Sequence, residues 1–584
     1  MTQKVYRELT FAAVSLGVLQ GVVLNLAFVY AALKLGFSIG GSTVAAIMGY
    51  ALLKGVLKVG TSVENNINQT IASGINTAGT GIVFTLPALF MLNAMWEQNG
   101  EATIGFTPWP FMIAGIAGSI IGVVLIIPLR KQMIDLDRLR FPSGVAVTTI
   151  IRSGSTGIGK AKILAMGFII SALWKIAVTY IHIPGIIEHE ELNLTFNGLL
   201  PIPGYLSPFL YLSLMNIAAG LLAGRGGLSF FAGGVLAWWV VSPIAVSLGW
   251  VPMTDAGVFD SGFIYGKMLR PLGIGALMGG ALMGVVMTFP AIKSAIVSLM
   301  NASKLAKTEG GQKSDEMPFG VLIIGLTSSV VLFFTAAYMI EGVTLTQALI
   351  TAVVGPLWMG LAALIVAQAT GMTDISPMSG MALISVTLMM FILDKNIAAA
   401  MVVAVAVCVA IGQAADMMQD LKTGFMIGGR PVKQQAVQFA VTWIGAIISI
   451  GAIYVLWQAG PNGQGGFGEG TALPAPQAGV LMGIITGLKT GVIPMDKYLL
   501  GGGIGALLAT APMSGLGVMV GLAMYLPFSI TLGYGIGCLT QMFIQKKKGL
   551  HFAEHKLVPF AAGLIIGEAI TGIGQAFVGI LQQM

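Results

Sequence analysis

The densest cluster of polar side chains in this otherwise apolar chain lies between positions 64 and 77. Amides and hydroxyls recur there at spacings of three and four residues: Asn66, Gln69, Ser73, Asn76 and Thr77. Side chains at this spacing share one face of a helix, so the segment predicts a polar stripe. Such a stripe can line an aqueous cavity and bind peptide-like groups, or it can join neighbouring helices in a membrane. The number of amides favours the first interpretation, and the candidate substrate-binding residues are Asn65, Asn66, Gln69, Thr70, Ser73 and Asn76.

A second polar cluster, at positions 373–380, interrupts another apolar run with Pro377 and Gly380. Proline and glycine inside such a run favour a discontinuous helix, whose freed backbone groups can bind a ligand or an ion. The alternative is a simple kink with an aspartate near the membrane surface. The candidate substrate-binding residues of this cluster are Thr373, Asp374, Ser376 and Ser379.

Two carboxylates, Glu64 and Glu568, are candidates for carrying a coupled proton. Glu568 stands alone in the apolar run 563–572, and Glu64 opens the amide-rich segment. Ionisable residues inside a membrane span are costly, and they commonly mark ion pathways or proton relays. The alternative for Glu568 is a pairing with a basic group or with backbone N–H donors.

Two further segments hold candidate gate residues. Asp416 and Asp420 are four positions apart and share a helix face, from which they could meet Lys422 or Arg430. An ordinary charge network at the membrane surface is the alternative. The run 141–155 opens with a Phe-Pro pair and is short for a span, which favours a half-helix or re-entrant segment. The candidate gate residues are Phe141, Pro142, Asp420 and Lys422.

The elements that position these residues must be membrane helices. Of the 584 residues, 56% are hydrophobic and 9% are charged, against roughly a quarter charged in soluble domains. The mean hydropathy is +0.89. No soluble chain could bury so much apolar surface, which excludes a soluble enzyme, a nucleic-acid binder and a scaffold. The 80 glycines fit close helix packing in a bilayer.

No cofactor or protein-bound metal is expected. Cys408 and Cys538 are far apart in apolar stretches and imply no disulfide framework. The segment 154–161 approaches a phosphate-binding loop, but Ala161 stands where a Ser or Thr must hold magnesium. The four histidines show no zinc-site spacing. A primary pump is therefore disfavoured, and no convincing pair of nucleophile and base suggests an enzyme.

The fold class expected is an all-α polytopic membrane protein with about 16 transmembrane helices in two related halves, with discontinuous or re-entrant segments. Apolar runs of spanning length lie near 9–35, 40–58, 66–92, 109–129, 161–183, 205–224, 226–248, 271–299, 319–340, 345–367, 371–393, 397–414, 435–457, 477–494, 498–512, 515–544 and 557–581. The expected parts are an N-terminal half (1–300), a cytoplasmic linker (301–318) and a C-terminal half (319–584). Similar glycine-rich helices, from Arg270 and from Val558, close the two halves.

Loop charges predict the orientation. Loops rich in Lys and Arg alternate with acidic loops that contain neither, the latter at 93–108, 184–204 and 460–476. Because basic loops stay on the cytoplasmic side, we expect a cytoplasmic N-terminus, in the inner (plasma) membrane of a cell.

Several segments resemble the oligopeptide transporter (OPT) family, in order and over most of the chain. They are VENNINQTIAS (63–73), LRFPSGVA (139–146), DLKTG (420–424), LPAPQA (473–478), VGLAMYLP (520–527) and GLIIGE (563–568). The chain looks like a prokaryotic member that is closer to the yellow stripe-like branch. The resemblance implies about 16 helices in two related halves, proton-driven uptake, and compatibility with a homodimer. It implies short peptides or glutathione-like compounds in one branch and metal–chelator complexes in the other.

Residues and resemblance together predict a proton-coupled symporter of small oligopeptides or peptide-like compounds that works by alternating access. The expected partners are a small peptide or metal-chelate substrate, protons and the lipid bilayer. Proton-coupled uptake of metal–chelator complexes is the alternative within the same fold. A passive channel is the alternative from another class, and it would accumulate nothing against a gradient.

Overall fold

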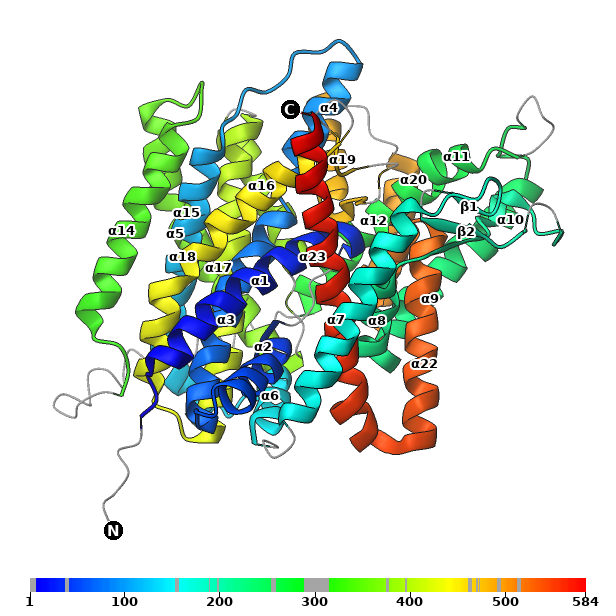
Figure 1. Ribbon diagram of the computed structural model, residues 1–584. Helices are drawn as coiled ribbons and strands as arrows, with labels where there is room; N and C mark the ends of the chain where they lie inside the picture. The colour runs from blue at the N-terminus through cyan, green and yellow to red at the C-terminus, as the bar shows by residue number, and fades with distance from the viewer. Residues whose placement is uncertain are drawn as a thin grey trace. The chain divides into compact units, whose positions relative to one another are not determined.

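The computed structural model describes residues 7–583 with gaps (Figure 1). The gaps are 37–40, 153–156, 189, 197–198, 254–258, 288–314, 374–375, 377, 394–395, 461–464, 469–470, 472, 491–494 and 512–515. The described chain forms two compact units, each assembled from three segments. Unit 1 comprises Met1–Ala32, Ser38–Ala161 and Thr288–Gly465, and unit 2 comprises Leu33–Phe37, Lys162–Met287 and Gly466–Met584. The units do not coincide with the expected sequence halves, and the duplication of the halves stays a prediction.

Helices dominate both units, as expected. The helices that lie wholly or mainly in unit 1 are α1 (Phe11–Leu35), α2 (Gly41–Tyr50), α3 (Ser62–Val83), α4 (Pro87–Gln98), α5 (Pro108–Ile126), α6 (Pro142–Arg152), α14 (Phe319–Tyr338), α15 (Leu345–Thr373), α16 (Met378–Ile392), α17 (Ile397–Ile427) and α18 (Pro431–Gln458). Those of unit 2 are α7 (Gly157–Tyr180), α8 (Leu214–Ala223), α9 (Leu228–Val235), α10 (Ser242–Ser247), α11 (Ser261–Phe263), α12 (Arg270–Met287), α19 (Pro476–Thr490), α20 (Met495–Ala509), α21 (Leu516–Tyr525), α22 (Phe528–Phe552) and α23 (Val558–Gln583). Ten helices of the described chain are long and apolar enough to cross a membrane. The protein is thus an all-α polytopic membrane protein, and the count of about 16 spans stays a prediction.

Helix α17 is the central element of unit 1. It packs against α3, α5, α15, α16 and α6 (Figure 1). The predicted span at 397–414 was too short, because α17 continues to Ile427. Its two aspartates, Asp416 and Asp420, were expected to share a helix face, and both are hydrogen-bonded to side chains of α3. The helix ends at Gly428, whose left-handed backbone (φ 90°) caps it with an N–H bond to the Gly424 carbonyl.

Close helix contacts in unit 2 depend on glycine. An added Cβ at Gly505 of α20 would overlap the Ala276 carbonyl oxygen of α12. At Gly563 of α23 it would overlap the Leu164 carbonyl oxygen of α7. Small residues let membrane helices approach until their backbones touch. The second contact holds α23, the helix that carries Glu568, close against α7.

Unit 2 also contains a small antiparallel sheet, of which two strands lie in the expected acidic loop 184–204 and the third lies in the predicted span 205–224. Its strands are β1 (Ile187–Glu188), β2 (Glu191–Asn193) and β3 (Phe209–Tyr211), with Glu191 opposite Tyr211. The predicted span at 205–224 was therefore wrong over its first part, since α8 begins only at Leu214. The predicted run 515–544 is broken between α21 and α22, where Pro527 precedes the first residue of α22.

Candidate functional site

Helix α3 begins with a capping box that accounts for Glu64. The Thr61 hydroxyl accepts the Glu64 N–H at 3.2 Å, and a Glu64 carboxylate oxygen accepts the Thr61 N–H at 2.6 Å. The two side chains thereby satisfy two backbone donors that the first helical turn leaves free. Glu64 is 8% exposed, so this candidate proton carrier lies buried at a helix end with a structural partner.

The polar side chains of α3 are buried on several sides of the helix. One set contacts α17: the Gln69 amide donates to Asp420, and the Ser73 hydroxyl donates to Asp416 at 2.5 Å. The Ser73 hydroxyl also lies 2.7 Å from the hydroxyl of Ser42 on α2. This set brings two predicted substrate-binding residues and one predicted gate residue into a single cluster.

A second set of α3 side chains contacts other helices. Asn65 donates to the Ala46 carbonyl oxygen of α2 at 3.0 Å, and Thr70 accepts from Gln434 of α18 at 3.0 Å. Asn66 donates weakly to Thr70 at 3.5 Å, and Asn76 is packed against Gly41 of α2. Each of these contacts joins two helices or two turns of α3, as the alternative interpretation expected.

The amide and carboxylate oxygens of this region are incompletely satisfied. Several buried ones have no hydrogen-bond partner within the described part of the chain: those of Asn65, Asn66, Gln69 and Asn76 and the Oδ2 atoms of Asp416 and Asp420. Buried polar atoms without partners are costly. Helix packing therefore uses these side chains only in part, and the remaining oxygens can accept hydrogen bonds from a ligand or coordinate an ion.

Asp416 and its neighbour Ser42 were absent from the sequence-based set of site residues. Asp416 was considered only together with Asp420, as part of a gate on one helix face. The structure gives neither aspartate a contact with Lys422 or Arg430, so that expected pairing was wrong. Asp420 and Lys422 are two positions apart on α17, and residues at that spacing do not face each other on a helix.

The other gate candidates lie where α6 meets α15 and α17. Phe141 is fully buried, has a left-handed backbone (φ 45°) and donates its N–H to the Gly371 carbonyl oxygen at 3.0 Å. Pro142 is the first residue of α6. Lys422 donates to the Leu139 carbonyl oxygen at 2.8 Å. Phe141, Pro142 and Lys422 thus belong to one junction, while Asp420 faces α3.

The second polar cluster lies at a helix break, as predicted. Helix α15 ends at Thr373, and α16 begins at Met378. The Ser376 hydroxyl between them lies 2.7 Å from the Thr370 hydroxyl. Asp374 and the side chains of Thr373 and Ser379 lie outside the described residues. The break is confirmed, and the binding role of these residues stays a prediction.

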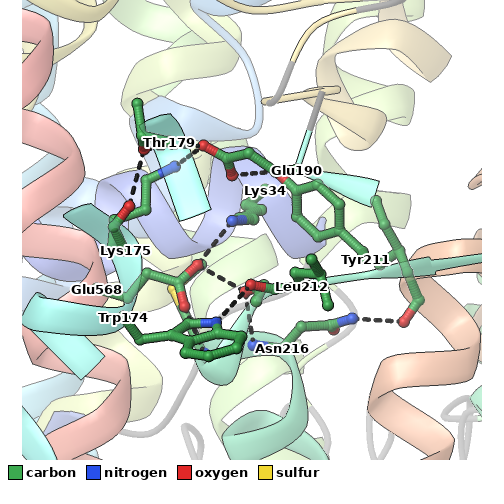
Figure 2. A network of polar contacts seen from close by, with 12 residues as sticks. Lys34, Trp174, Lys175, Thr179, Glu190, Tyr211, Leu212, Asn216 and Glu568 are labelled. Atoms are coloured by element: carbon green, nitrogen blue, oxygen red, sulfur yellow. Dashed lines mark hydrogen bonds and ion pairs between the residues drawn. The ribbon is translucent and has the colours of Figure 1, made fainter. Parts of the chain in front are cut away.

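Glu568 of α23 forms a buried ion pair inside unit 2 (Figure 2). Its Oε1 atom lies 2.8 Å from the ammonium group of Lys34, in the last turn of α1, and accepts the Ser213 hydroxyl at 2.6 Å. Its Oε2 atom accepts the Met215 N–H at 2.8 Å. The side chains of Lys34 and Glu568 are 0% and 1% exposed. These are the contacts that the alternative interpretation of Glu568 expected, but Lys34 could not be identified as the partner from sequence.

A second ion pair lies beside the first (Figure 2). Glu190, between β1 and β2, pairs with Lys175 of α7 and accepts the Tyr211 hydroxyl at 3.2 Å. The Lys34 ammonium lies over the ring of the same tyrosine, 4.4 Å from its centre. Burial alone would raise the pKa of Glu190, but the charges of Lys34 and Lys175 outweigh it and hold the pKa below its ordinary value. Glu190 was expected as a loop charge and is instead part of this network.

An open pocket lies at the end of α4 in unit 1. Its volume is about 620 Å³, and its lining combines aromatic and acidic side chains, among them Phe90, Glu97, Glu101, Phe106 and Trp457. Asn93 fixes the loop beside it through two hydrogen bonds with the backbone of Ile104, at 2.7 and 2.9 Å. None of the sequence-based site residues lines this pocket.

Cys408 and Cys538 are free and buried, so the expectation of no disulfide between them is confirmed. Within the described ranges, no group of three or more His, Cys, Asp or Glu side chains is placed to hold a metal ion. What the clusters above offer is buried amide, hydroxyl and carboxylate oxygens in unit 1 and a buried ion pair in unit 2.

Comparison with known proteins identifies the family. The family of OPT oligopeptide transporter proteins matches residues 8–578. The chain belongs to the oligopeptide transporter family. A Haemophilus influenzae protein provisionally named an oligopeptide transporter is 26% identical, over 94% of this chain and 92% of its own. The metal-nicotianamine transporter YSL2 of Arabidopsis thaliana is 22% identical, over 97% and 92% of the two chains. The resemblance noted from the short segments is thereby confirmed, yellow stripe-like relatives included.

Proposed function

We propose that this oligopeptide transporter family member is a proton-coupled symporter of small oligopeptides or peptide-like compounds that works by alternating access. The observation that carries the proposal is the set of buried amide oxygens without partners on α3, within the described part of the chain. A peptide presents backbone N–H groups and an ammonium terminus, and such donors match carbonyl and carboxylate oxygens. Asn66, Gln69 and Asn76 would contact the substrate. The helix break at 373–378 would complete the site, with Asp374, Ser376 and Ser379.

In this proposal, Glu568 carries the proton. Protonation of its Oε1 atom would neutralise the carboxylate and remove the charge that holds Lys34. The ammonium of Lys34 would then interact mainly with Glu190, whose pKa it already lowers. A buried lysine that exchanges one carboxylate for another changes the local packing of α23 against α1. Glu64 is the second candidate, and its carboxylate is held at the start of α3 by the capping box with Thr61.

The proposed gate is the junction of α6 with α15 and α17. Phe141 plugs this junction, and its left-handed backbone is costly for a residue with a large side chain. Straightening this residue would release its bond to Gly371 at the end of α15, next to the helix break. Asp420 and Lys422, on opposite sides of α17, would transmit the movement between the amide cluster and the gate.

Proton-coupled uptake of metal–chelator complexes is the second candidate function. It is favoured by the likeness to metal-nicotianamine transporters, which extends over nearly the whole chain in the Arabidopsis protein. Here the chelator would supply the metal ligands, and the transporter would bind the chelator's carboxylates and amines. We further propose that the protein lies in the plasma membrane with its N-terminus on the cytoplasmic side. From the family resemblance we also propose that it forms a homodimer.

Uptake into proteoliposomes with an imposed inward proton gradient tests the proposal. The vesicles are offered a mixed pool of di- to hexapeptides, glutathione, and iron–chelator complexes with and without iron. Accumulation of peptides above the external concentration, lost when an uncoupler collapses the gradient, is the expected result. Accumulation of the metal-loaded chelators alone would favour the second candidate. Equilibration of every solute, with or without the gradient, would indicate a passive channel and contradict the proposal.

A further inference from the structure

We propose that Asp416 and Asp420 of α17, with Gln69 and Ser73 of α3 and Ser42 of α2, form a binding site for a small monovalent cation, for which Na⁺ is the probe. The site shares Gln69 with the proposed substrate contacts and Asp420 with the proposed gate, and it is separate from the proton-carrying role of Glu568. It goes beyond the proposed function because it adds an ion-binding activity in unit 1.

The first argument is the convergence of five side chains from three helices. Asp416 and Asp420 are one helical turn apart on the same face of α17. The Asp416 Oδ1 atom accepts the hydroxyls of Ser73 at 2.5 Å and Ser42 at 3.4 Å, and those hydroxyls lie 2.7 Å from each other. The Gln69 amide nitrogen donates to the Asp420 Oδ1 atom. Five potential oxygen ligands are thus held within a few hydrogen-bond lengths.

The second argument is that the oxygens facing away from these bonds have no partner. The Oδ2 atoms of both aspartates and the Oε1 atom of Gln69 accept no hydrogen bond from any described residue. Gln69 is 0% exposed and Asp420 is 1% exposed, and although Asp416 is only partly buried, its Oδ2 atom is buried as well. Three unsatisfied acceptors with no donor among them need a cation or a donor from outside the chain.

The third argument is charge. No lysine or arginine within the described ranges forms an ion pair with Asp416 or Asp420. Two neighbouring carboxylates repel each other when both are ionised, and burial makes the repulsion larger. A cation bound to the two carboxylates would reduce this repulsion and would satisfy free oxygens at the same time.

The number of oxygens favours a monovalent ion. Calcium takes about six to eight oxygen ligands, and magnesium demands a near-ideal octahedron and gives up its water reluctantly. The cluster offers three free oxygens and the lone pairs of two hydroxyls, which is fewer than calcium requires. A small ion with a single charge fits a site with few ligands, which here come from three helices.

The test is equilibrium binding of radiolabelled Na⁺ to the purified full-length protein in detergent, with choline as the inert replacement. Substrate and proton gradient are absent, so the result is independent of whether the protein transports peptides. The variants are Asp416→Asn and Asp420→Asn, which keep the side-chain size, and Ser73→Ala, which removes a single hydroxyl. Asp315→Asn is the matched control, because Asp315 is 55% exposed and pairs only loosely with Arg430, at 3.4 Å.

We expect saturable Na⁺ binding by the wild type and by Asp315→Asn. Each aspartate variant should bind Na⁺ at least about tenfold more weakly. Mutation of a residue that only supports a metal ligand already lowers metal affinity by about that factor, and a direct ligand should matter at least as much. Ser73→Ala should fall between them, and it keeps the test valid if an aspartate variant fails to fold. The absence of saturable binding by the wild type would overturn the proposal, and so would unchanged binding by the folded variants. Displacement of Na⁺ by Ca²⁺ or Mg²⁺ but not by Li⁺ would overturn the monovalent assignment.

Discussion

Replacing Glu568 by glutamine isolates the charge of the buried ion pair in unit 2. Glutamine has nearly the same size and can still accept the Ser213 hydroxyl, but it leaves the Lys34 ammonium, 0% exposed, without the carboxylate 2.8 Å away. Removing one partner of a buried ion pair typically costs about 3–5 kcal/mol, because the other charge stays buried and uncompensated. Glu568→Gln keeps the Ser213 hydrogen bond, and the charge of Glu190 lies near Lys34. We therefore expect the variant to lose about 3 kcal/mol of unfolding free energy, the lower end of that range.

The same reasoning predicts that the loss is recovered when both charges are removed. The double variant Lys34→Met/Glu568→Gln leaves no buried ion, so it should be more stable than Glu568→Gln alone. Thermal unfolding of the purified proteins in one detergent gives the order of stability, and the four proteins of the cycle isolate the pairwise interaction. Asp496→Asn is the control in the same unit, since Asp496 pairs with Lys497 at the surface and should unfold like the wild type.

Transport gives the second readout of the same variants. If Glu568 carries the proton, Glu568→Gln should exchange substrate across the membrane but no longer accumulate it with a proton gradient. Wild-type stability of Glu568→Gln would refute the electrostatic reasoning. Lowered stability together with full proton-driven accumulation would show that the ion pair is structural and that the proton moves elsewhere.

Three other predictions concern Glu190, Gly505 and Glu64. Because the pKa of Glu190 is lowered by the fold, its contribution to stability is fully present above its ordinary value of 4.5 and is lost as the pH falls through the lower value of the folded protein. Glu190→Gln should therefore be less stable at neutral pH and should lose this part of the acid dependence in thermal unfolding; an unchanged acid dependence would contradict it. Gly505→Ala should destabilise unit 2 by about 1–3 kcal/mol through overlap with the Ala276 carbonyl, whereas Gly503→Ala, with open space around it, should stabilise the helix slightly; equal unfolding temperatures would disprove the packing argument. Glu64→Gln should keep its stability and its proton-driven uptake, because glutamine also completes a capping box, while Glu64→Ala should unfold more easily by about 1 kcal/mol; loss of coupling in Glu64→Gln would make Glu64 the proton carrier.

Much of the architecture could be predicted because it follows from local sequence. The apolar composition indicates membrane helices, and the Pro-Gly interruption after Thr373 predicts the break before α16. The amides of α3 were expected on a buried helix for the same reason. All these features depend on the spacing of residues within one segment of the chain.

Other features depend on contacts between distant segments and could not be predicted. Lys34 and Glu568 are 534 positions apart, and nothing near either residue indicates the other. Asp420 was expected to meet Lys422 or Arg430, but its partner is Gln69, 351 positions away. Asp416 was left out of the candidate site residues for a similar reason, because its partners, Ser42 and Ser73, lie on the distant helices α2 and α3. The four-residue spacing of the two aspartates predicts their shared helix face, but it does not indicate which helices they contact.

The most direct test of proton-coupled symport measures proton movement itself. A pH-sensitive dye is sealed inside proteoliposomes that have no imposed pH gradient and an inward-directed gradient of a peptide that the protein accumulates. We predict that adding the peptide acidifies the interior of wild-type vesicles and leaves Glu568→Gln vesicles unchanged. Entry of the peptide into wild-type vesicles without any acidification would contradict proton-coupled symport.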